Sequence, residues 1–161
     1  MKACSTGNTV DIRSPNSTRP WQHVLEPLSG YLALASSLSK SKENHAEAFN
    51  FGPHANQNYS VSEVIDEMAL CWDRVRWNDT SKSNNQMNEA GLLKLNCDKA
   101  LTKLQWVPVL NFDETIKMTV EWYKIYYEKK FTSMSDTTIS QIKEFTNLAR
   151  KRKVNWSLSD D

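Results

Sequence analysis

Glycine is scarce in this 161-residue chain, which has only Gly7, Gly30, Gly52 and Gly91. They lie too far apart to form a GxGxxG or P-loop motif, in which glycines let backbone amides approach phosphate groups closely. No GxSxG, HExxH or paired-cysteine motif occurs either. The sequence therefore excludes a self-contained dinucleotide site, and we expect this chain alone to bind no cofactor.

Cysteines, long apolar runs and net charge are also limited. Cys4, Cys71 and Cys97 are widely separated, which indicates free thiols rather than a disulfide framework. No run approaches the roughly 20 apolar residues of a membrane span, and the first residues lack the apolar stretch of a signal peptide. Twenty basic and nineteen acidic side chains leave a net charge of +1, so no overall field attracts nucleic acid or an anionic membrane. We expect a cytoplasmic protein that binds neither.

Candidate catalytic and metal-binding sets are weak. The histidines His23, His45 and His54 lie in different predicted elements, so no metal site is expected. Tyr126 and Lys130 have the Tyr-x-x-x-Lys spacing in which a lysine lowers the pKa of a tyrosine. The pair ends a long amphipathic helix with no nucleotide loop before it, and we interpret it as a surface pair.

The pattern of apolar residues predicts a mixed α/β chain with few, short strands. We expect strands at residues 8–13, 48–51 and 75–77, and a loop at 78–88. A helix is predicted to open with Pro27 in its first turn and to bury one face. That face carries Leu28, Tyr31, Leu32, Ala35 and Leu38.

Side-chain caps predict where the other helices begin. Ser60 with Glu63, and Asn111 with Glu114, have the spacing of a capping box. Asn96 is predicted to cap a helix that stops before Pro108. The last helix is predicted to be capped by Ser135 or Asp136, to bury Ile139, Ile142, Phe145 and Ala149, and to end in the basic run at 150–153, which complements the helix dipole. These helices need more surface than the few strands offer, so we infer that they cover a sheet that this chain does not supply in full.

Residues 10–27, VDIRSPNSTRPWQHVLEP, combine two arginines with a tryptophan, a histidine and several amide and hydroxyl groups. The segments IRSPNSTRPWQHVLEPLSGYL, FNFGP, EAGLLKLNCDKA, LQWVP and TVEWY resemble, in order, the C-terminal half of the CDP-glucose 4,6-dehydratases. These are extended short-chain dehydrogenase/reductase enzymes of bacterial surface-sugar (lipopolysaccharide O-antigen) synthesis. The resemblance runs from about residue 3 to residue 128, and more loosely through the last helix.

The resemblance implies that the N-terminal Rossmann half of the enzyme, with the NAD loop and the catalytic Tyr-x-x-x-Lys pair, lies outside this chain. The expected fold is then α/β, a mostly helical nucleotide-sugar-binding lobe with a few short strands. Its substrate lobe would span residues 1–131, followed by a helix and tail at 132–161. NAD would belong to the intact enzyme, and the segment AFNF to its dinucleotide-binding sheet.

The resemblance also indicates substrate-binding residues. Related enzymes place an arginine at the position of Arg19 to hold the diphosphate, and a guanidinium suits phosphate oxygens. Arg13 and Asn16 could reach the nucleotide or the sugar, and Trp21 either contacts the ligand or packs. In the family pattern HEAHxLKLD, Asn88 and Gly91 replace the histidines and Asn96 replaces the aspartate. Alternatively, Arg13 and Arg19 are surface residues that flank a turn.

In the intact family enzyme, NAD oxidises C4 of glucose, water leaves across C5 and C6, and the hydride returns to C6, which gives CDP-4-dehydro-6-deoxyglucose. We expect this chain to bind CDP-glucose and to be inactive alone. A non-catalytic sugar-nucleotide-binding or partner protein that complements a separate Rossmann chain, a decayed remnant and a helical scaffold are the alternatives. Without the missing half, the apolar faces should make the chain self-associate.

Overall fold

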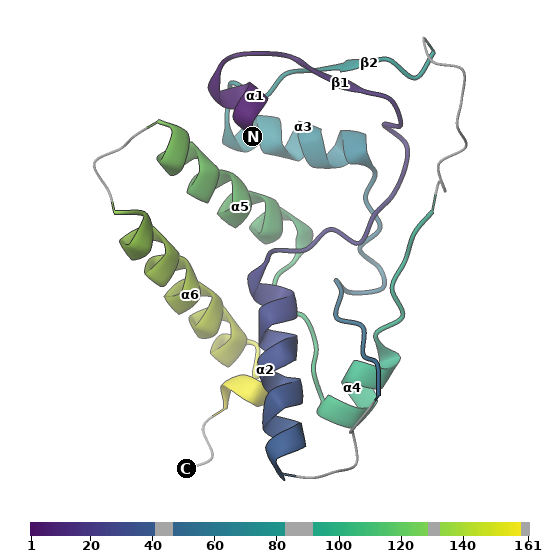
Figure 1. The fold of residues 1–161 in the computed structure, drawn as a ribbon, viewed down its shortest axis with the longest axis vertical. Helices are drawn as coiled ribbons and strands as arrows, with labels where there is room; N and C mark the ends of the chain where they lie inside the picture. Colours follow the sequence, from purple (N-terminus) through teal and green to yellow (C-terminus); the bar gives the residue numbers. More distant parts are fainter. Residues whose placement is uncertain (41–46, 83–91, 129–132, 159–161) are drawn as a thin grey trace.

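A computed structural model describes residues 1–40, 47–82, 92–128 and 133–158. In this part of the chain the fold is mostly helical with one two-stranded sheet (Figure 1). The helices are α1 (Lys2–Ser5), α2 (Leu25–Lys40), α3 (Val61–Cys71), α4 (Asp98–Leu104), α5 (Phe112–Tyr127), α6 (Met134–Lys151) and the 3-10 helix η1 (Asn155–Ser157). The strands are β1 (Val10–Ile12) and β2 (Trp77–Asp79). None of the helices described is long and apolar enough to cross a membrane.

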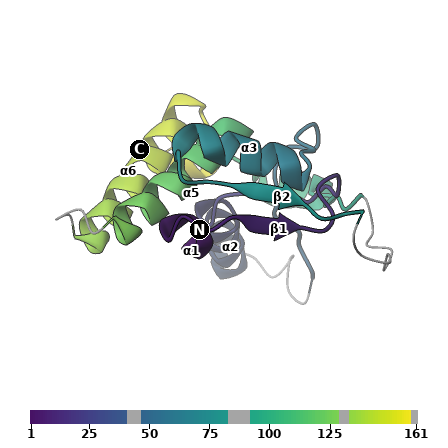
Figure 2. The same cartoon turned by 90° about the horizontal axis from the view of Figure 1, so that it is seen from above.

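The two strands are parallel, with Val10 paired to Trp77 and Ile12 to Asp79. Figure 2 shows them side by side next to α3. The predicted strand at 8–13 is confirmed, whereas the second strand starts at Trp77 rather than at residue 75. Val75 instead closes a turn, since its N–H donates to the carbonyl of Trp72 at 3.0 Å and its side chain is buried in the core.

The predicted strand at 48–51 is wrong for the part of the chain that the structure describes, where residues 47–53 pair with no strand. Side chains bond to this segment instead. The amide of Gln22 donates to the carbonyl of Phe51 at 3.0 Å, and Asn50 donates to the carbonyl of Asn96 at 3.2 Å. Phe51 is nevertheless buried, packed on Trp106 and on the bare face of Gly30, where an added Cβ would lie 2.3 Å from the ring.

Both predicted capping boxes are confirmed. Ser60 accepts a hydrogen bond from the backbone of Glu63 at 3.3 Å, and the Glu63 carboxylate accepts from the Ser60 N–H at 2.7 Å. Asn111 and Glu114 make the same pair of bonds, both at 2.9 Å. The N-cap of α4 is Cys97 rather than the predicted Asn96, although the side chain of Asn96 accepts from the Asp98 N–H at 2.9 Å. The two capping boxes therefore fix where α3 and α5 begin.

The start of α6 was predicted too late. Its N-cap is Ser133, which accepts from the N–H of Asp136, so neither Ser135 nor Asp136 is the cap. The inward face is also different from the prediction. Phe145 and Ala149 are buried, but Ile139 and Ile142 are exposed, because the stripe that faces α5 continues through polar side chains. Gln141 takes one of those positions by donating to the carbonyl of Met118 at 2.6 Å.

The described core consists of three clusters, two of which include residues of α5. The first joins α3 to α5, the second joins α5 to α6, and the third lies between α2 and α4. Their buried members are respectively Cys4, Val64, Trp72, Val75, Phe112, Ile116 and Val120; Val109, Leu110, Met118, Phe145, Ala149 and Val154; and Phe51, Ala100 and Trp106. Because the second cluster draws on both α5 and α6, burial of apolar area stabilises the packing of the last helix on the rest of the chain.

The apolar face of α2 is not buried as predicted. Leu28, Tyr31 and Leu32 are exposed, with Leu32 at 73 %. The buried residues of this helix are Glu26, Ser29 and Gly30, on the opposite side. Tyr31 meets the ring of Phe51 edge-on, whereas Leu28 and Leu32 line a hollow of about 950 Å³ shared with α4, α6 and η1 and stay open to solvent.

Candidate functional site

The loop that follows β1 is fixed against the start of α3. The N–H of Val61 donates to the carbonyl of Ser17 at 3.0 Å, and the N–H of Ser62 donates to that of Pro15 at 2.9 Å. Thr18 also forms an isolated antiparallel bridge with Ser60. The segment that carries Arg13, Asn16 and Arg19 therefore has a defined position rather than that of a loose surface loop.

These same bonds close the start of α3 to a ligand. The free N–H groups of a helix start commonly bind anions. Here the amides of Ser60 and Glu63 bond within the capping box, and those of Val61 and Ser62 bond to the loop. None of these four amides is therefore open to an anion.

Arg19 lies between two hollows. The smaller, of about 40 Å³, is lined by Arg19, Pro20, Pro53, His54, Ala55, Gln57, Asn58, Leu93, Lys94 and Leu95. The larger, of about 250 Å³, is lined by Asp11, Ile12, Arg13, Ser14, Ser17, Arg19 and Val61. The Nη1 of Arg19 donates to the carbonyl of Thr18 at 2.7 Å. The structure thus brings Arg13 and Arg19 to one hollow, while Asn16 is exposed on the same loop.

Trp21 packs into the protein. Its indole N–H donates to the carbonyl of Tyr59 at 2.9 Å, and its ring lies against the first core cluster. Asn88 and Gly91 lie outside the described residues. Of the five substrate-binding residues that the sequence indicates, the structure therefore places two arginines at a hollow, one amide on the adjoining loop and one tryptophan against the core.

Other side chains of the RPWQHVLEP motif build the scaffold around Arg19. Gln22 bonds to the backbone of Phe51, as described above. His23 is buried and accepts from the N–H of Leu25 through Nδ1 at 3.3 Å. Burial lowers the pKa of His23, which is consistent with a neutral ring whose Nδ1 is an acceptor.

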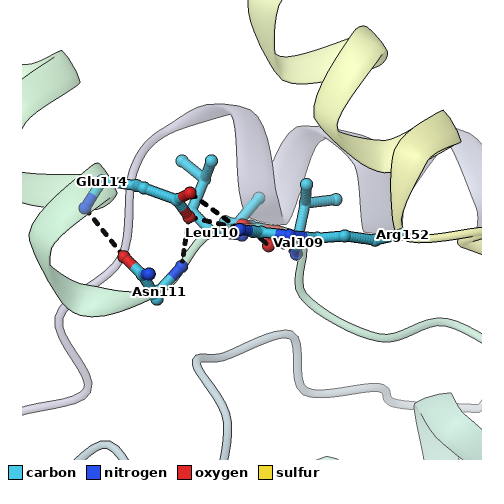
Figure 3. Close-up of polar contacts among 6 residues, drawn as sticks. Val109, Leu110, Asn111, Glu114 and Arg152 are labelled. Carbon is cyan, nitrogen blue, oxygen red and sulfur yellow. Dashed lines mark hydrogen bonds and ion pairs between the residues drawn. The ribbon is translucent and has the colours of Figure 1, made fainter.

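Glu26, the acidic residue of this motif, is buried, with 1 % of its surface exposed. Its carboxylate accepts from the N–H groups of Val109 and Leu110 at 2.6 to 3.0 Å. Burial raises the pKa of Glu26 to about 7, although the two backbone N–H groups and the charge of Arg152 act in the opposite direction. The residue joins α2 to the segment before α5, whose polar surroundings are drawn in Figure 3.

Arg152 holds the other side of that segment (Figure 3). Its guanidinium bonds both oxygens of Glu114, at 2.9 and 2.7 Å, and also donates to the carbonyl of Val109. The bond to Arg152 holds the pKa of Glu114 below its usual value. The sequence interpretation of residues 150–153 as solvated cations at a helix end missed this role, and only the basic run itself pointed to it.

Three segments far apart in the sequence meet at the smaller hollow. Gln22 ties residues 19–22 to residues 51–53, and the preceding Asn50 bonds to the carbonyl of Asn96, which follows residues 93–95. Leu95 packs on Gly52, where an added Cβ would lie 3.1 Å from its side chain. His54 and Lys94 reach the hollow in this way, and sequence reasoning did not single them out. Among the described residues, no cluster of His, Cys, Asp and Glu could hold a metal ion.

Fold and site together define a mostly helical α/β chain in which a lobe of three converging segments presents basic side chains. No family model matches the sequence. The chain is 38 % identical over 127 residues to the CDP-glucose 4,6-dehydratase of Salmonella typhimurium. The match covers 78 % of this chain and 35 % of that relative, in its C-terminal part. The resemblance is therefore confirmed: this chain is related to the C-terminal part of a CDP-glucose 4,6-dehydratase, and it spans about a third of the length of that relative.

Proposed function

We propose that this chain forms the CDP-sugar-binding part of a CDP-glucose 4,6-dehydratase, and that Arg19 is its main contact with the diphosphate. The observation that carries the proposal is the position of Arg19, which lines the hollow where the segments at 19–22, 51–53 and 93–96 meet. These are segments in which the chain resembles the dehydratases.

The chemistry of the site supports an anionic ligand. A diphosphate carries about two negative charges, and a guanidinium can bond two phosphate oxygens at once in a planar fork. Arg13 adds a second guanidinium in the larger hollow. The ligand would lie across Arg19, with its diphosphate near the arginine and its nucleoside or sugar over the loop at 13–18.

The residues of this chain do not fit NAD. The sequence has no glycine-rich loop, and the amides at the start of α3 are bonded within the protein. We therefore propose that dehydration of the sugar takes place only where an NAD-binding half completes the enzyme. The role of this chain would be to bind and orient the substrate.

Calorimetric titration of the purified chain with CDP-glucose tests this proposal, with UDP-glucose and CDP as comparison ligands. We expect binding that prefers the CDP sugar. Arg19→Ala should weaken it about 10- to 100-fold, the usual effect of losing hydrogen bonds to a charged group. Arg150→Ala is the matched control, because Arg150 is exposed on α6. A folded chain that binds none of the three ligands would contradict the proposal and favour a decayed remnant.

A second candidate is a non-catalytic protein that complements a separate Rossmann chain. The observation that favours it is the open apolar face of α2. Mixing the chain with the isolated N-terminal half of a CDP-glucose 4,6-dehydratase should then give a 1:1 complex in size-exclusion chromatography with light scattering. Leu32→Ser should weaken the complex, and independent elution of the two chains would count against this candidate.

A further inference from the structure

The smaller hollow beside Arg19 is lined by basic side chains, a grouping that the sequence alone did not reveal. Arg19, His54 and Lys94 line it together, although they come from three different segments. Of the ten described residues that line it, none has a carboxyl group. The larger hollow differs in this respect, because Asp11 lies there with Arg13 and Arg19. An anion is therefore attracted more strongly to the smaller hollow.

The backbone of the segments that carry His54 and Lys94 is held by contacts within the protein. The turn at 54–57 is closed by the Gln57 N–H, which donates to the carbonyl of His54 at 2.8 Å. Lys94 precedes Leu95, whose side chain packs on Gly52. These contacts hold the backbone of both segments, and His54 and Lys94 line the same hollow as Arg19 without any ligand.

The size of the hollow restricts what can enter. A volume of about 40 Å³ holds about three water positions, since one water needs roughly 10–15 Å³ by this measure. It can admit a phosphate group but is too small for a base or a sugar ring. The rest of a nucleotide sugar has to lie outside it, toward the larger hollow on the other side of Arg19.

We propose that Lys94 and His54 are diphosphate-binding residues, and that they hold one phosphate group of the nucleotide sugar in the hollow beside Arg19. Lys94 supplies a point charge with three donors, His54 supplies a ring N–H, and Arg19 bonds the diphosphate from the side of the larger hollow. This inference rests on the proposed function, because it names the groups that would hold the diphosphate of the same ligand.

The test uses the full chain and inorganic pyrophosphate as the ligand in a calorimetric titration. Lys94→Met keeps the length of the side chain and removes its charge, and Lys94→Arg keeps the charge. We expect Lys94→Met to weaken pyrophosphate binding about 10-fold or more and Lys94→Arg to retain most of it, with a smaller loss for His54→Ala. Lys151→Met, an exposed lysine on α6, should bind like the unchanged chain. Circular dichroism of each variant confirms that it is folded.

Two results would overturn the inference: a folded chain that does not bind pyrophosphate, or a Lys94→Met variant that binds it as tightly as the unchanged chain does. A competing titration with CDP-glucose separates this inference from the proposed function. If CDP-glucose binds through Arg19 but is insensitive to Lys94→Met, the inference is wrong and the proposed function stands. If pyrophosphate binding depends on Lys94 but CDP-glucose does not displace it, the anion site stands and the proposed function fails.

Discussion

Replacing Glu26 gives the sharpest test of how this fold is held together. The Glu26 carboxylate accepts from two buried backbone amides, those of Val109 and Leu110. Glu26→Ala leaves both without an acceptor, and each unsatisfied buried group costs about 1–3 kcal/mol. The free energy of unfolding should therefore fall by about 2–6 kcal/mol. In Glu26→Gln one oxygen can still serve both amides, because Oε1 accepts from each of them, and we expect a smaller loss.

The pH dependence of the same variants tests the burial of the carboxyl group. The pKa of Glu26 is raised to about 7 in the folded protein, whereas it is close to 4.5 in an unfolded chain. Between these values the folded state holds the proton more tightly, so stability is greatest at low pH and declines as pH rises from about 4.5 to about 7. The full effect is about 3 kcal/mol, at 1.36 kcal/mol for each pKa unit. Glutamine does not titrate and should lack this decline.

Urea unfolding followed by tryptophan fluorescence at pH 5, 6, 7 and 8 measures both effects. His23 contributes in the opposite direction, because a pKa lowered by burial makes stability fall as pH drops below about 6.5. The quantity to compare is therefore the difference between the unchanged chain and Glu26→Gln, in which the contribution of His23 largely cancels. A difference that stays constant from pH 5 to pH 8 would show that the pKa of Glu26 is not raised in the folded protein. An Ala variant as stable as the unchanged chain would refute the reasoning.

Two further predictions concern the Arg152–Glu114 pair and the open face of α2. Arg152→Gln breaks the two-bond pair with Glu114; we expect a loss of about 1 kcal/mol, as for a partly exposed pair with good geometry, and Arg152→Lys should not restore it fully in the same unfolding assay. The exposed Leu28 and Leu32 should make the chain bind ANS and associate with rising concentration, whereas Leu32→Ser should reduce both; a monodisperse monomer that does not bind the dye would be inconsistent with this reading.

The features that could be predicted from the sequence are those that depend on neighbouring residues. The capping boxes at Ser60 and Asn111 need only side chains three positions apart, and both are present as predicted. The strand at 48–51 failed because a strand needs a partner, and in the described residues side-chain amides bond to this segment instead. The polar stripe of α6 was missed for a similar reason: Gln141 is buried only because the carbonyl of Met118 is there to accept its hydrogen bond.

In the candidate site, too, some features could be predicted from the sequence and others could not. Arg13 and Arg19 share one loop, so their proximity could be predicted, and the structure places both at one hollow. His54 and Lys94 join Arg19 only through the folding of residues 51–58 and 93–95 against residues 19–22. A pattern of residue types along the chain does not contain that information. Asn88 was predicted from the family pattern, and as a substrate-binding residue it remains a prediction.

The contacts of the RPWQHVLEP motif show that most of its conspicuous side chains support the fold. Trp21, Gln22, His23 and Glu26 all bond to groups of the protein itself, at Tyr59, Phe51, Leu25 and the backbone of residues 109–110. A chain that folds in this way needs them whether or not it binds a sugar nucleotide. Arg19 differs from them in lining both hollows. A role as a substrate lobe therefore depends on Arg19, His54 and Lys94, which line one hollow. Substitution of these three residues should change ligand affinity and leave stability nearly unchanged.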